Sequence, residues 1–168
     1  MELRGKIMKA TQKQVFQTIL TAASSSGARQ NLIFLQAESG RGKSYLLRAA
    51  EAHLKNGTQE PPVKVRYVTA DDFTSELIDA YRNGSVESFR KTYGSLDVLM
   101  VDDVECMAGR EATQTHFLEI LDQIHPAGGT VVLAGTGLPE LLKNRDWMVL
   151  EPELPDRKLA EEILKEAQ

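Results

Sequence analysis

Residues 37–44, AESGRGKS, leave few folds open to this chain. The apolar run from Leu32 to Leu35 before them is typical of a buried strand, and Ser44 to Leu54 after them has helical spacing. A glycine-containing turn between a strand and a helix aims several backbone N–H groups at one point, and the helix start adds its positive dipole end. We therefore predict an anion-binding loop within alternating strands and helices.

The same residues fit the phosphate-loop pattern G-x-x-x-x-G-K-[ST] everywhere except at the first glycine, which is Ala37. That replacement matters only if the position requires positive φ. Lys43 would supply charge to the β- and γ-phosphates of ATP or ADP, and Ser44 would place its hydroxyl on Mg²⁺. The alternative is a Gly/Ser-rich turn with an incidental lysine. The loop residues predicted to contact the nucleotide are Ala37, Glu38, Ser39, Gly40, Arg41, Gly42, Lys43, Ser44 and Tyr45.

Two carboxylates end a later apolar run, DVLMVDD at residues 97–103. A buried strand would hold Asp102 at the carboxyl edge of a sheet, where it can orient the water shell of Mg²⁺. Asp103 would polarise the attacking water, so Asp103 and Lys43 are the candidate catalytic residues. In isolation such an acidic pair could also begin a turn and carry no chemistry. The phosphate loop upstream favours metal-assisted phosphoryl transfer to water.

Strands and helices alternate along the rest of the chain. Further strands are predicted at Val63 to Val68, Leu96 to Val101, Thr130 to Ala134 and Met148 to Leu150. Further helices are predicted after a Thr11 cap, from an Asp71 or Asp72 cap to Tyr81, from Val86 to Tyr93, from Thr113 to Ile124, near Leu138 to Lys143, and from Asp156. This alternation indicates a mainly parallel sheet covered on both faces, an α/β three-layer sandwich. Without an internal repeat or a long linker, residues 1–168 are predicted to form a single domain.

The charge balance gives no global reason to bind nucleic acid. The 168 residues carry a net charge of -4 and the pI is near 5.5, so any contact with DNA needs a local patch. The first thirty residues lack the apolar stretch of a signal peptide or membrane helix, and the one cysteine, Cys106, cannot form an internal disulfide. We expect a cytoplasmic protein without a membrane partner, in which Cys106 is a structural thiol.

The centre of the chain resembles a known family. Residues 67–107, YVTADDFTSELIDAYRNGSVESFRKTYGSLDVLMVDDVECM, resemble the DnaA family of AAA+ ATPases, in which a helical insertion precedes an Asp-Asp motif. Residues 108–114, AGREATQ, are similar to that family's AGKERTQ-type segment. The resemblance runs from about Gln14 to the C-terminus. VECMAG at 104–109 and DWMVLEPELPDRKLAEEIL at 146–164 look closer to the regulator Hda and to proteobacterial initiators than to helicase loaders.

The resemblance implies an ATP-binding AAA+ domain that acts in the initiation of DNA replication or in its regulation, with a helical insertion at about 71–93. It implies assembly with a DnaA-type AAA+ protein or with further copies of this chain. It also implies contacts with single-stranded DNA at Ile78, Arg110 and Thr113, although Ala112 stands where the family has a basic residue. The alternative keeps Ile78 in the core and Arg110 as a solvated loop charge.

Departures from the family on the far side of the nucleotide predict slow or partner-dependent hydrolysis. Thr136, in LAGTGLP, replaces the polar residue that senses the γ-phosphate, and is the last predicted nucleotide contact. Arg145 only approximately fills the place of the arginine finger, which contributes on the order of 10³ to 10⁵ in rate in related enzymes. We expect no helical lid domain. Two alternatives stay open, a non-hydrolysing interaction module and a DnaC-like helicase loader or transposition ATPase.

Overall fold

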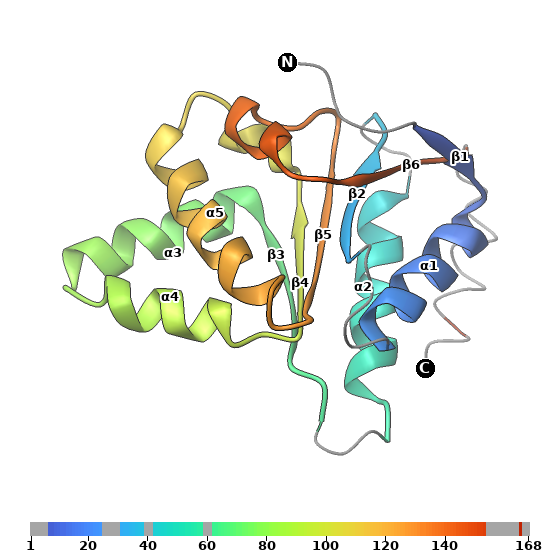
Figure 1. Ribbon diagram of the computed structural model, residues 1–168, viewed down its shortest axis with the longest axis horizontal. Helices are drawn as coiled ribbons and strands as arrows, with labels where there is room; N and C mark the ends of the chain where they lie inside the picture. Colours follow the sequence, from blue (N-terminus) through green and yellow to red (C-terminus); the bar gives the residue numbers. More distant parts are fainter. Residues whose placement is uncertain (1–6, 25–30, 39–41, 59–61, 154–164, 166–168) are drawn as a thin grey trace.

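Parallel strands form the centre of the protein in a computed structural model that describes residues 7–24, 31–38, 42–58, 62–153 and 165 (Figure 1). In these ranges the strands are β1 (Met8–Ala10), β2 (Leu32–Gln36), β3 (Val65–Thr69), β4 (Val98–Asp102), β5 (Thr130–Gly135) and β6 (Met148–Pro152). Their order in the sheet is β1-β6-β2-β5-β4-β3, and the pairings are parallel throughout. Consequently, the carboxyl ends of β2, β4 and β5 lie at the same edge of the sheet.

Helices cover both faces of the sheet. They are α1 (Gln12–Ser24), α2 (Lys43–Lys55), α3 (Ala70–Arg82), α4 (Val86–Gly94) and α5 (Glu111–Ile124), with the 3₁₀ helices η1 (Val104–Met107) and η2 (Glu140–Asn144). In Figure 1, α1 and α2 lie on one side of the sheet, and α3, α4 and α5 lie on the other. Each face of the sheet has its own hydrophobic core, and successive side chains of β4 point alternately into the two. Met100 packs with α1 and α2, whereas Leu99 and Val101 pack with α3 and α5. The predicted three-layer α/β sandwich with a parallel sheet is confirmed.

The start of α3 differs from the prediction. Thr69, rather than Asp71 or Asp72, caps this helix, because its side chain accepts the N–H of Asp72 at 3.1 Å. The two aspartates lie in the first turn instead, where the helix dipole favours carboxylates. The cap of α1 is as predicted: Oγ1 of Thr11 accepts the N–H of Gln14 at 3.1 Å, and Oε1 of Gln14 accepts the N–H of Thr11.

Other helices and strands begin at different residues than predicted, and two short elements were not predicted. The strands predicted from Val63 and Leu96 both begin two residues later, and the carboxylate of Asp97 accepts the N–H of Lys64 at 2.8 Å just before both strands. The helix predicted from Thr113 begins at Glu111, and the one predicted near Leu138 is the 3₁₀ helix η2. β1 and η1 are too short to show a periodicity and were not predicted. Apart from Lys165, the helix predicted from Asp156 lies outside the described residues.

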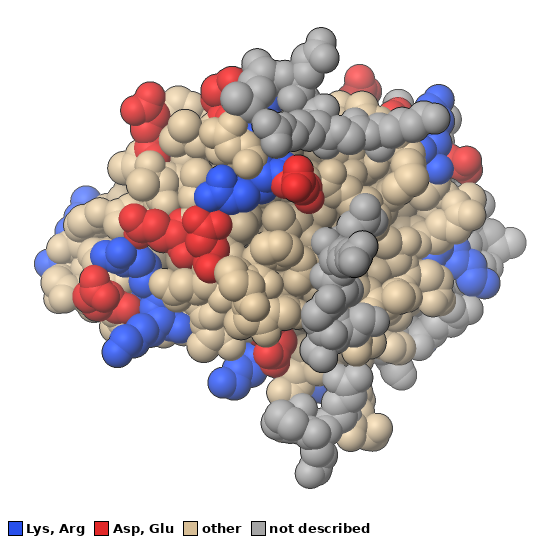
Figure 2. All heavy atoms as spheres, in the orientation of Figure 1, with Lys and Arg blue, Asp and Glu red and all other residues tan. Residues whose placement is uncertain are grey.

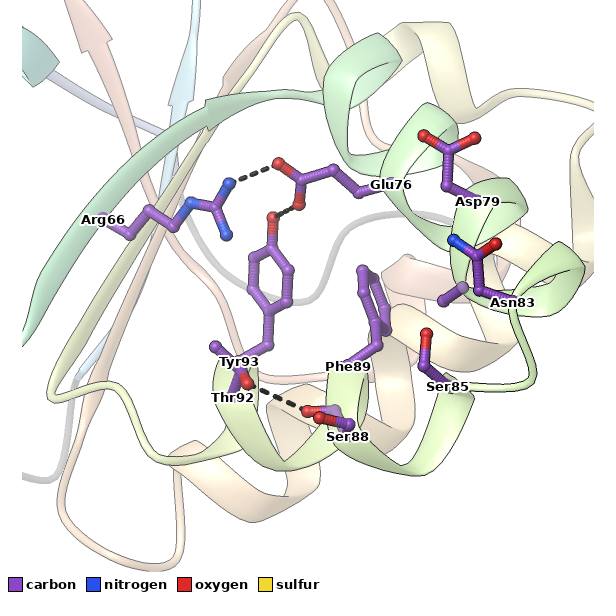
Figure 3. A pocket seen from close by; sticks show the side chains of 10 residues that line it. Arg66, Glu76, Asp79, Asn83, Ser85, Ser88, Phe89, Thr92 and Tyr93 are labelled. Atoms are coloured by element: carbon purple, nitrogen blue, oxygen red, sulfur yellow. Dashed lines mark hydrogen bonds and ion pairs between the residues drawn. The ribbon is translucent and has the colours of Figure 1, made fainter.

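Helices α3 and α4 occupy the predicted insertion. Their contact is aromatic, since the ring of Phe73 lies 5.4 Å from that of Phe89 and 5.1 Å from that of Tyr93, between centroids. Glu76 of α3 accepts hydrogen bonds from both Arg66 of β3 and the hydroxyl of Tyr93, as Figure 3 shows. The insertion is thereby tied to β3, the strand next to β4.

Candidate functional site

The loop between β2 and α2 is fixed at both ends, and its central residues, Ser39, Gly40 and Arg41, lie outside the described residues. Gly42 has φ 77° and ψ 11°, the left-handed conformation that favours glycine, and its carbonyl accepts the N–H of Leu46 at 3.1 Å. Ala37 donates its N–H to the carbonyl of Gly135 in β5 at 3.0 Å. Among described residues other than glycine only Asp103 has positive φ, so the position of Ala37 does not require glycine.

Lys43 begins α2 and is almost fully buried, with 5% of its surface exposed. Its Nζ donates hydrogen bonds to the carbonyl oxygens of Ala37 and Glu38, the second at 3.2 Å. The ammonium group thus lies within the loop, where a phosphate held by the loop would meet its charge. Tyr45 is about half exposed on the first turn of α2, and its contact with a nucleotide stays a prediction.

Asp102 is where the loop and the acidic strand end meet. It is 1% exposed at the end of β4. Its Oδ2 accepts hydrogen bonds from the hydroxyls of Ser44 and Tyr67, the second at 2.7 Å, and its Oδ1 accepts the N–H of Asp103 at 2.9 Å. The two residues predicted to serve magnesium, Ser44 and Asp102, are therefore in contact. Tyr67 was missed, because its only signal in the sequence is its position in a strand before the insertion.

Asp103 turns the chain out of the sheet. It has φ 53° and ψ 44°, a left-handed conformation that aspartate tolerates better than most residues do. Burial raises the pKa of its carboxyl group, and the charges of Asp102 and Glu105 raise this pKa further, while Lys43 opposes them. A half-buried carboxylate next to the loop is suited to accepting a proton from water.

Glu105 is a second residue that the sequence analysis missed. Its Oε2 accepts the N–H of Thr136 at 3.3 Å and lies only 2.3 Å from where a Cβ on Gly135 would stand. Thr136 follows β5 and is exposed beside the loop, so its predicted sensing role keeps a suitable location and stays a prediction. A hollow of about 320 Å³ at this place is lined by Gln36, Ala37, Glu38, Thr136, Glu151 and Pro152.

The three predicted DNA contacts lie together on another part of the surface. Ile78, Arg110 and Thr113 line one groove of about 550 Å³ between α3 and the start of α5. Ile78 is 45% exposed, so the alternative that places it in the core is wrong. Thr113, by contrast, is buried, and Arg110 forms an ion pair with Asp71 at 3.3 Å.

Tyr81, which was not predicted, also lines this groove and is 56% exposed. On the face shown in Figure 2, positive and negative side chains are interspersed over α3, α4 and α5. Any affinity of this face for nucleic acid therefore depends on local contacts in the groove rather than on a basic stripe.

Arg145 is held within its own chain. Its guanidinium donates two hydrogen bonds to the carboxylate of Asp122 in α5, at 3.2 Å from Nε and 2.9 Å from Nη2. Arg145 precedes β6, which begins beside the start of β2, so it lies toward the sheet edge opposite the loop. A role as an arginine finger would require this bidentate pair to open.

The loop between β2 and α2 surrounds the ammonium group of Lys43, and the acidic end of β4 lies beside it in a parallel sheet. These features define a phosphate-loop domain of the AAA+ type. The model of the bacterial DnaA ATPase domain family matches residues 6–150, and the chain belongs to this family. No helix in the described part of the chain is long and apolar enough to span a bilayer.

Individual relatives agree with this assignment. The chromosomal replication initiator protein DnaA of Synechococcus sp. (strain JA-2-3B'a(2-13)) is 37% identical over 123 residues, which are 73% of this chain and 26% of that protein. AMPPCP-bound DnaA from Aquifex aeolicus has a TM-score of 0.77 and 28% identity, covering 98% of this chain and 53% of that one. A replication initiator DnaA bound to AMPPCP and single-stranded DNA has a TM-score of 0.76 and 28% identity, covering 96% and 53%. The chain spans about a quarter to a third of the length of the curated relatives it matches.

Proposed function

We propose that this chain binds ATP and ADP with Mg²⁺ in the cytoplasm and acts in the initiation of DNA replication or in its regulation. The observation that carries the proposal is the contact between Ser44 and Asp102 beside the buried Lys43. Similarity to DnaA bound to AMPPCP, a nucleotide analogue, supports the choice of ligand. Its partner would be a DnaA-type AAA+ protein or further copies of this chain, since the relatives are initiators of replication.

The groups around Asp102 fit a magnesium ion. Its carboxylate is almost fully buried, and its described hydrogen bonds come from two hydroxyls and one amide, none of which carries a positive charge. Burying a carboxylate without a cation is unfavourable, and Mg²⁺ prefers oxygen ligands. Ser44 and Asp102 would hold the ion, while Lys43 neutralises phosphate charge. When bound, magnesium supplies charge neutralisation for phosphoryl transfer.

Calorimetry with ATP and with ADP, in Mg²⁺ and in EDTA, tests nucleotide binding directly. Lys43→Met should weaken binding about 100-fold, because it removes several charge-assisted hydrogen bonds from the phosphates. Lys91→Met, on the exposed surface of α4, removes the same charge far from the loop and should leave the affinity unchanged. Equal affinities for all three proteins, or no binding by the unaltered protein, would refute the proposal.

We further propose that hydrolysis is slow or depends on a partner. The position of Asp103 directly after β4, near Lys43, supports a role as general base. Arg145, however, is engaged by Asp122, and a missing finger lowers the rate on the order of 10³ to 10⁵. The unaltered protein should therefore turn over ATP slowly, and Asp103→Asn should turn it over more slowly still. Equal background rates in both would favour the second candidate, a non-hydrolysing interaction module, which the weak finger and Thr136 already favour.

Single-stranded DNA is the ligand we propose for the groove between α3 and α5. The support is the common location of Ile78, Arg110 and Thr113, together with the similarity to a DnaA structure that contains single-stranded DNA. The ion pair of Arg110 with Asp71 is exposed and so weak enough to open for a phosphate. Arg110→Ala should lower the salt slope of binding by about one, whereas Lys91→Ala should not change it. An unchanged slope for Arg110→Ala would remove this residue from the interface.

A further inference from the structure

One face of α2 is directed toward Tyr67. Ser44, Arg48 and Glu51 follow each other at helical spacing along this face, and each has a separate relation to the tyrosine. Ser44 donates to the same carboxylate oxygen of Asp102 as Tyr67 does. The guanidinium of Arg48 lies 5.1 Å from the centroid of the tyrosine ring. The carboxylate of Glu51 accepts the backbone N–H of Tyr67 at 2.8 Å.

These contacts fix Tyr67 at three points, although β3 is at the edge of the sheet. Glu51 satisfies a backbone group that an edge strand would otherwise expose. The guanidinium of Arg48 over the ring adds a cation–π interaction. The neighbouring residue, Arg66, points to the other face of the sheet, where it bonds Glu76 and covers the ring of Tyr93 (Figure 3). β3 is therefore held from both faces, and the hydroxyl of Tyr67 has a defined position.

That hydroxyl completes the hydrogen bonding of Asp102. The N–H of Asp103 fixes Oδ1, and the hydroxyls of Ser44 and Tyr67 fix Oδ2, so the plane of the carboxylate is set by donors on both of its oxygens. Ser44 is also the residue proposed to place its oxygen on magnesium. Tyr67 is then the donor to Oδ2 that does not itself serve the metal.

We propose that Tyr67 is a positioning residue of the magnesium–nucleotide site, whose phenol holds Oδ2 of Asp102 next to Ser44. This inference rests on the proposed function. A tyrosine phenol is protonated at neutral pH and can therefore donate to the carboxylate. A carboxylate held in this orientation loses less freedom when the ion binds than one free to rotate.

Tyr67→Phe removes the hydroxyl alone, because the ring under Arg48 and the N–H to Glu51 remain. In Mg²⁺, the affinity for ATP should fall roughly ten-fold, the loss of one hydrogen bond to a charged group. In EDTA, the affinity should not change. The magnesium concentration at half-saturation, measured at a fixed ATP concentration, should rise by the same factor. Tyr93→Phe is the matched control, since its hydroxyl bonds Glu76 on the other face of β3 and lies outside the site.

The outcomes separate two failures. If the unaltered protein binds no ATP in either buffer, the proposed function fails and the inference fails with it. If the unaltered protein binds ATP in Mg²⁺ and Tyr67→Phe binds it equally well, only the inference fails. Equal losses in Mg²⁺ and in EDTA would show a structural role and would also overturn it. Thermal unfolding of Tyr67→Phe without nucleotide tells whether this variant keeps its fold. Tyr67→Leu, which lacks both the hydroxyl and the ring, should show the same shift in magnesium dependence.

Discussion

Ser44 and Asp102 lie 58 residues apart in the chain and share a hydrogen bond at the carboxyl edge of the sheet. Ser44 is in the first turn of α2, directly after the loop, and Asp102 is the last residue of β4. In the sheet β5 separates β2 from β4, so this bond reaches across a strand. It therefore joins the loop to the acidic strand end through side chains alone.

A double-mutant cycle should detect this connection. In Mg²⁺, Ser44→Ala and Asp102→Asn should each lower the affinity for ATP at least about ten-fold, because the first removes a hydroxyl oxygen and the second removes the negative charge that would face the ion. The double variant should lose little more than the worse single variant, with a coupling of about 0.5–3 kcal/mol. Calorimetry in Mg²⁺ measures all four affinities. Strictly additive losses would show that the two residues do not act on the same ion.

Gly135 should tolerate a side chain poorly. A Cβ at this position would stand 2.9 Å from Cγ1 and 3.2 Å from the backbone N of the buried Val104 on η1, whereas the flexible end of the Glu105 side chain could move away. Gly135→Ala should therefore lower the free energy of unfolding by about 1–3 kcal/mol, through overpacking between β5 and η1. Chemical denaturation followed by the fluorescence of Trp147, the one tryptophan in the sequence, measures the change.

Gly137→Ala is the matched control, because a Cβ there meets nothing within 4 Å and the backbone does not have positive φ. Its free energy of unfolding should stay within about 0.5 kcal/mol of the unaltered protein. If both alanine variants are equally stable, the close approach of Val104 on η1 to β5 is not a constraint on the fold.

Local patterns were sufficient to predict most of the fold. The apolar run of β4 and the AESGRGKS stretch before α2 were recognisable because their signals lie within ten residues. The same signals placed Lys43, Ser44 and Asp102 at one edge of the sheet, since the ends of parallel strands share an edge.

Residues whose surroundings depend on strand order could not be predicted in this way. Tyr67 reaches Asp102 only because β3 pairs with β4, and Glu105 reaches Thr136 only because η1 turns back over β5. Neither relation leaves a periodicity in the sequence. The cap of α3 was misassigned for a related reason. Thr69 is both the last residue of β3 and the cap of α3, so no loop residue is left between them for a capping aspartate.

Trp147 should be important for the stability of the segment before β6. It is 3% exposed, and its Nε1 donates to the carbonyl of Leu142 at 2.7 Å. Trp147→Phe should lower the free energy of unfolding by about 2 kcal/mol, because it leaves that buried carbonyl without its partner and reduces the packed volume. Circular dichroism during urea unfolding is a suitable measurement, since the variant lacks a tryptophan. A change below about 0.5 kcal/mol would mean that water replaces the indole as donor at little cost.

The backbone of Asp103 gives a way to separate its chemistry from its conformation. Its φ of 53° lies in the left-handed region, where asparagine is tolerated, glycine is favoured and β-branched residues are strained. The free energy of unfolding of Asp103→Asn should therefore stay within about 0.5 kcal/mol of that of the unaltered protein, whereas that of Asp103→Val should be lower by about 1–3 kcal/mol.

Two measurements on each variant distinguish the chemistry of the carboxylate from the conformation of the backbone. They are urea unfolding and ATP turnover, for Asp103→Asn, Asp103→Gly and Asp103→Val. If Asp103 acts as the base, the asparagine and glycine variants keep their fold and their affinity for ATP but lose turnover. If turnover instead falls only in the unstable valine variant, the carboxylate is not the base, and the conformation of the turn between β4 and η1 is what the site requires.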